Sequence, residues 1–145
     1  QRYFGSPVGK YRIPILFYQP GQLLPTRSEE LVGQVDLMPS ILDHLNYQKP
    51  FAAFGRSIWR DDRPSVVCQR SGNLYQLFTD EFLLLYGEGN DTRLYRYRTD
   101  RLLEDNLADR NPGVRDSLLR ELMVLLAQLV QLAQLVLLDL LVLMV

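Results

Sequence analysis

His44 and Cys68 carry the most versatile side chains of this sequence, because an imidazole transfers protons or binds metals and a thiolate is a nucleophile. Each residue type occurs once. His44 follows Asp43 on the polar side of a predicted helix, where a lone histidine is more often a solvated surface group than a ligand or a base. Cys68 lies in a predicted strand beside Val66 and Val67, which favours a buried, inert thiol. Neither residue alone predicts a catalytic centre.

A metal centre is not expected within this chain. Catalytic zinc or manganese sites need several carboxylate or imidazole ligands that converge on the ion. The chain has one histidine, and its acidic residues stand mostly in turn-like or helix-surface contexts. The four arginines between positions 56 and 70 lie close to Asp61 and Asp62, which is typical of a paired, solvated surface rather than an anion site. We therefore expect no catalytic residue and no metal ligand in this chain.

Length and charge narrow the class of protein. The 145 residues, 47% of them hydrophobic and 23% charged, suit one globular domain with a real core. The formal net charge of -1 supplies no long-range field for nucleic acid, so a nucleic-acid partner is not expected. A single cysteine excludes an internal disulfide.

One helix, predicted over residues 36–45, organises the rest of the chain. Asp36 has the side chain of an N-cap, Pro39 falls in the first turn, and Asn46 tolerates the left-handed conformation in which helices often stop. The apolar residues recur at helical spacing and predict a buried face, whereas Ser40 falls with Asp43 and His44 on the polar side. The members of the apolar face are Leu37, Met38, Ile41, Leu42 and Leu45.

The segments on either side of this helix are predicted from their turn residues. Residues 1–10 contain two glycines and a proline and predict a loop, and the apolar run 11–18 predicts a buried strand with Pro14 at its first residue or on an unpaired side. Residues 65–70, 74–78, 82–86 and 93–98 predict an antiparallel meander. In its last strand, arginines alternate with aromatic residues on the two faces, so one face of the sheet is expected to meet water.

Asn111 and Pro112 begin the last predicted helix with a cap residue and a proline at the first helical position. From residue 122 onward the helix is strongly apolar and long enough for a membrane span. Asp139 argues against a span, because an aspartate near a helix centre costs about 2.5–3.5 kcal/mol on insertion scales. The composition favours a soluble packing or self-associating helix over a membrane segment. We divide the chain into residues 1–120 and an apolar helix over residues 121–145.

Two blocks carry a resemblance to a known family. Residues 33–42 (GQVDLMPSIL) and 54–59 (FGRSIW) resemble the signature of the lipoteichoic acid synthase-like sulfatases, members of the alkaline phosphatase superfamily. Farther on, a set of residues is similar to the element that closes many sulfatase domains: Leu94, Tyr95, Asp100, Glu104, Asn106 and Leu107. The resemblance covers roughly residues 8 to 120. It implies the C-terminal subdomain of an alkaline phosphatase-like fold, which is of the α/β class. The subdomain itself would be an α+β fragment whose first strand continues a larger sheet.

The resemblance also implies a function for a longer parent protein. Such enzymes act on sulfate or phosphate esters with a Thr or Ser nucleophile and a divalent metal (Mn, Zn, Ca or Mg), and these groups would lie upstream of the present residues. Arg2, Tyr3 and Lys10 would edge the active site and meet a sulfate or phosphate oxygen. The upstream catalytic part would be the partner, and the parent would be anchored in the cell membrane with an extracellular or periplasmic catalytic domain. The alternative is a non-catalytic module that packs or binds a partner, for example through the apolar tail.

Overall fold

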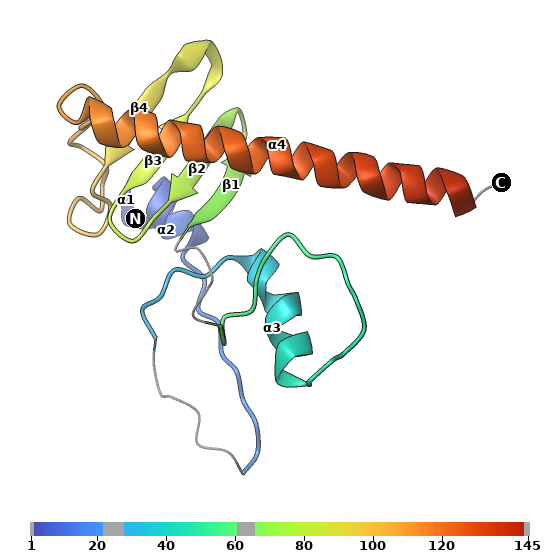
Figure 1. Ribbon diagram of the computed structural model, residues 1–145. Coiled ribbons are helices and arrows are strands. Elements are labelled where there is room, and N and C mark those ends of the chain that lie inside the picture. The colour runs from blue at the N-terminus through green and yellow to red at the C-terminus, as the bar shows by residue number, and fades with distance from the viewer. Residues whose placement is uncertain (1, 22–27, 61–65, 144–145) are drawn as a thin grey trace.

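A computed structural model describes residues 2–21, 28–60 and 66–143, and for Arg2, Asn90 and residues 136–143 it describes the backbone alone. Asp61, Asp62, Arg63 and the first residue of the predicted 65–70 strand lie outside the described residues. The chain forms a sheet with a helix on each side, and a separate lobe around a short helix lies below it (Figure 1). This arrangement confirms a mixed helix-and-sheet fold with a small antiparallel sheet and a long C-terminal helix.

The sheet is the predicted antiparallel meander. Its strands are β1 (Val67–Ser71), β2 (Leu74–Phe78), β3 (Leu83–Tyr86) and β4 (Thr92–Tyr95), in the order β1-β2-β3-β4. Leu84 lies between Leu77 of β2 and Leu94 of β4 in the register, so the three leucines form one row across the sheet. The last strand is shorter than predicted, because the chain turns after Tyr95 and the Arg96 carbonyl accepts bonds from the backbone of residues 99 and 100.

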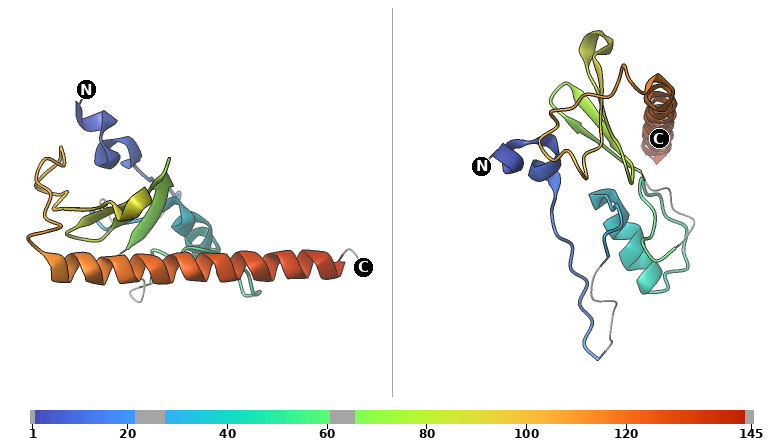
Figure 2. Two further views of the ribbon diagram at one scale, coloured as in Figure 1. Left: turned by 90° about the horizontal axis from the view of Figure 1, so that it is seen from above. Right: turned by 90° about the vertical axis from the view of Figure 1, so that its left-hand side faces the viewer.

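Helices cover both faces of this sheet. Helix α4 (Pro112–Leu143) packs Leu122 against Leu77, Leu84 and Leu94, all four fully buried. Helices α1 (Arg2–Gly5) and α2 (Pro7–Tyr11) lie on the opposite face, where Val8 packs in the second buried cluster (Figure 2). The prediction of a water-exposed face was therefore wrong for the middle of the sheet. Arg96 and Arg98, which were predicted for the exposed face, are exposed but lie in the segment after β4 and not in the sheet.

The N-terminal predictions were also wrong. The expected loop over residues 1–10 forms the helices α1 and α2, since the Ser6 side chain caps α2 by accepting a bond from Gly9 N at 3.1 Å and Pro7 fits its first turn. The expected buried strand over residues 11–18 is not part of the sheet: residues 12–19 are extended, and Leu16 and Tyr18 are 90% and 82% exposed. An apolar run predicts a strand, but a strand also needs a neighbour, and the described chain offers none to this segment.

The lower lobe contains a 3-10 turn, η1 (Gln34–Asp36), followed by α3 (Leu37–His44). The helix and its end at Asn46, whose φ is 53°, confirm the prediction. The predicted buried face was wrong: its residues Met38, Ile41 and Leu45 are 48%, 49% and 69% exposed, whereas Ser40 is fully buried. The reason is that the chain after residue 54 packs on the Ser40 side of α3 and leaves the apolar stripe uncovered.

The second half of α4 projects beyond the sheet (Figures 1 and 2). Leu118, Leu119, Leu125 and Leu126 pack against the core, but the apolar side chains farther along α4 are exposed, among them Val130 at 58% and Leu135 at 59%. Over Pro112–Leu135 the helix is long and apolar enough to cross a membrane by length and composition, and little of it is buried. The division of the chain at residue 121 stays a prediction.

Candidate functional site

Asp36 joins the two segments of the lower lobe, the segment that leads into α3 and the segment around residues 54–59. One carboxylate oxygen accepts a hydrogen bond from Gly33 N, and the other accepts one from Arg56 N, both at 2.9 Å. Gly55 passes so close to the Val35 carbonyl that a Cβ there would lie far inside van der Waals contact. A glycine is therefore required at this crossing, and Asp36 binds the chain on both sides of it. Among the described residues, the Asp36 side chain makes no N-cap hydrogen bond to α3. Both of its carboxylate oxygens accept hydrogen bonds from the loop backbone instead.

Ser40 makes the second connection between the same segments. Its hydroxyl donates to the Asp36 carbonyl at 2.5 Å and accepts from Ile58 N at 3.0 Å. The Ser40 carbonyl accepts a third bond from Trp59 Nε1, also at 3.0 Å. The side chain is fully buried, which is favourable because the hydroxyl has both a donor and an acceptor partner. The helical pattern predicted Ser40 on the polar side of the helix. In the structure its hydrogen bonds place it in the interior of the lobe.

The element after β4 has an equivalent polar anchor. Asn106 Oδ1 accepts bonds from Leu94 N at 3.0 Å and Ala108 N at 3.1 Å, and Leu107 N donates to the Leu94 carbonyl at 2.8 Å. Leu107 packs in the buried cluster under α4. In the preceding turn, the Asp100 carboxylate accepts bonds from the backbone N–H groups of residues 104 and 105. These side chains fix the path from the sheet to α4.

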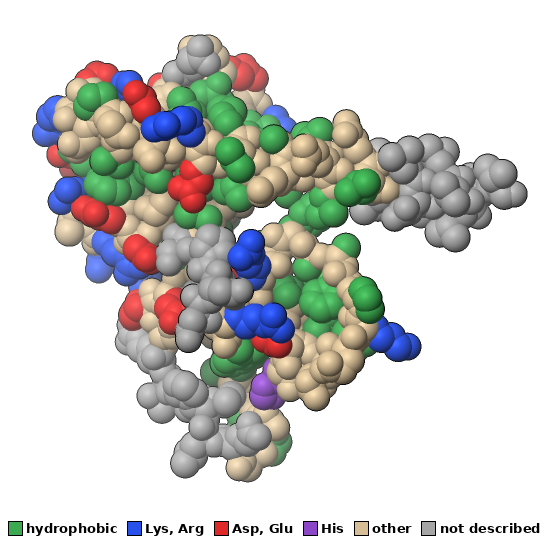
Figure 3. All heavy atoms as spheres, viewed as in Figure 1, with side chains coloured by type: hydrophobic (Ala, Val, Ile, Leu, Met, Phe, Trp, Pro, Cys, Tyr) green, Lys and Arg blue, Asp and Glu red, His purple; other side chains and the backbone are tan. Residues whose placement is uncertain are grey.

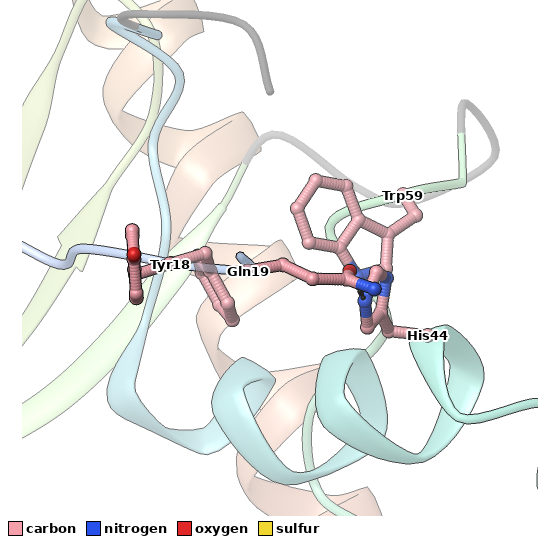
Figure 4. Close-up of a pocket in the computed structure, with 5 residues that line it drawn as sticks. Tyr18, Gln19, His44 and Trp59 are labelled. Carbon is pink, nitrogen blue, oxygen red and sulfur yellow. Dashed lines mark hydrogen bonds between the residues drawn. The ribbon is translucent and has the colours of Figure 1, made fainter. Parts of the chain in front are cut away.

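His44 and its neighbour do not form an acid–base pair. His44 Nε2 lies 2.6 Å from Gln19 Oε1 (Figure 4). The two side chains line a small cavity of about 60 Å³, together with Trp59, Phe17 and Tyr18. The cavity holds a few water molecules at most and is too small for an ester substrate. The ring of Trp59 meets the ring of Phe17 edge-on at 5.2 Å. This cluster fastens the extended segment 12–19 to α3.

Asp43 has a different partner. Its carboxylate accepts two bonds from the Arg60 guanidinium, at 3.0 and 3.2 Å. These bonds, aided by Ser57, hold the Asp43 pKa below its usual value. The carboxylate therefore stays ionised and does not orient the imidazole of His44. The prediction that His44 is an ordinary surface histidine is consistent with this separation.

Of the three predicted substrate-binding residues, the structure describes the side chains of Tyr3 and Lys10, and no described contact joins these two. Tyr3 packs beside the buried cluster on the α2 face of the sheet, and its phenol bonds to Arg12 and raises the Arg12 pKa. Lys10 is exposed, with Nζ 5.5 Å from the Tyr11 ring centroid. The side chain of Arg2 lies outside the described part of the chain. The sequence missed Arg12, because it stood inside a predicted strand and nothing in the spacing linked it to Tyr3.

Cys68 is half-buried against the cluster under α4, and burial raises the pKa of its thiol. A raised pKa keeps the thiol protonated and therefore poorly nucleophilic. Within the described residues there is no group of three or more His, Cys, Asp or Glu side chains that could hold a metal ion. Comparisons with protein-family models, curated proteins and solved structures found no match.

Proposed function

We propose that this chain is the C-terminal part of a metal-dependent sulfatase- or phosphotransferase-type enzyme that resembles the lipoteichoic acid synthase-like sulfatases. One observation carries the proposal. The blocks 33–42 and 54–59, which hold the resemblance, are 11 residues apart in sequence, and Asp36 and Ser40 bond the first directly to the second. Contact between the two blocks is expected if they form one local structural unit, and this contact supports the proposal.

In this proposal the chain supplies a frame and not the reacting groups. The metal (Mn, Zn, Ca or Mg) and the Thr or Ser nucleophile that the resemblance implies would belong to upstream sequence. Lys10 and Tyr3 stand on the N-terminal helices through which the chain would approach that site. A lysine ammonium and a phenol are suitable donors to a sulfate or phosphate ester, with Arg2 as the third predicted contact.

The complete gene provides the first test. We expect its upstream region to encode metal-binding carboxylates, a Thr or Ser nucleophile and an Asp-His pair shortly before residue 1. We also expect a membrane anchor that exposes the catalytic domain outside the cell or in the periplasm. Protease treatment of whole cells or spheroplasts should then digest the parent protein. An upstream region without these groups, or a strictly cytoplasmic parent, would reject the proposal.

A second candidate function rests on the projecting half of α4. Val124, Val130 and Leu135 are each more than half exposed, which is unusual for apolar side chains on a helix of a monomer. The alternative is a non-catalytic module that self-associates through this helix. Light scattering after gel filtration tests it on the chain and on a version that ends at residue 127: a dimer or larger assembly that becomes a monomer on truncation supports self-association. A monomer in both cases rejects it.

A further inference from the structure

We draw no further inference here: the strongest candidate, the exposed apolar stripe that Met38, Ile41 and Leu45 form on α3 in the lower lobe, on whose surface Figure 3 shows apolar side chains, is an unpartnered helix face, and nothing in the structure shows what covers it.

Discussion

Replacing Ser40 by alanine removes the hydroxyl that bonds the two segments of the lower lobe. The variant leaves the part-buried Ile58 N–H without its partner, which costs about 1–3 kcal/mol, and it also loses the bond to the Asp36 carbonyl, worth about 1 kcal/mol. The Ser40 side chain is fully buried, so water has little access to the space that the hydroxyl leaves. We expect Ser40→Ala to lower the free energy of unfolding of this lobe by about 2–4 kcal/mol.

Trp59 makes the assay specific to this lobe. It is the only tryptophan of the chain, and its indole N–H donates to the Ser40 carbonyl. Urea unfolding followed by tryptophan fluorescence therefore reports on the contacts around Ser40, while far-UV circular dichroism reports mainly on α4. Ser117→Ala is the matched control, because Ser117 is exposed on α4 and its replacement should change stability by less than about 0.5 kcal/mol. A fluorescence midpoint for Ser40→Ala that equals that of the control would refute the bridging role of Ser40.

Three further sets of variants probe the other contacts. Gly55→Ala should shift the tryptophan emission and destabilise the lobe, because its Cβ has no space, whereas Gly5→Ala, with nothing near its Cβ, should be silent in the same urea titration. Asn106→Ala should lower the free energy of unfolding seen by circular dichroism by about 2–3 kcal/mol, since two backbone N–H groups lose their acceptor; an unchanged midpoint would show that water replaces it. Carbon-13 NMR should find the Asp43 pKa below its usual value, and Arg60→Gln should raise it. Because the folded pKa is depressed, this pair stabilises the fold above the unfolded pKa and is lost as the pH falls through the folded pKa; acid should therefore destabilise Asp43→Asn less than the wild type.

The elements that depend on local signals were predictable. The meander follows from short β-rich runs between turn residues, and α4 begins at the proline that the capping rules indicate. Helix α3 was also predicted, but its buried side was not. Helical spacing identifies an apolar stripe, and only the rest of the protein determines whether something covers it. Ser40 is the opposite case, because a hydroxyl is buried readily once both of its bonds are made.

The N-terminal region shows why the remainder could not be predicted. Ser6 and Pro7 have the residue types of a helix N-terminus, but the two glycines in residues 1–10 led to the prediction of a loop. In the structure, Gly9 permits the close approach of α2 to the Tyr3 carbonyl. The pairing of Tyr3 with Arg12 depends on how two short helices pack, which spacing does not encode. The predicted cluster of Arg2, Tyr3 and Lys10 depended on the family resemblance alone, and it stays a prediction.

The most direct test of the central claim compares the parent protein with the 145-residue chain in two assays, calorimetry with manganese and zinc and turnover of a chromogenic phosphodiester and a sulfate ester. If the chain is the frame of an enzyme whose reacting groups lie upstream, the parent should bind metal and hydrolyse at least one ester. The chain alone should do neither, because in this account the metal ligands and the nucleophile lie upstream of it. Tight metal binding with turnover by the chain alone, or a parent that is inactive on both esters, would contradict this account.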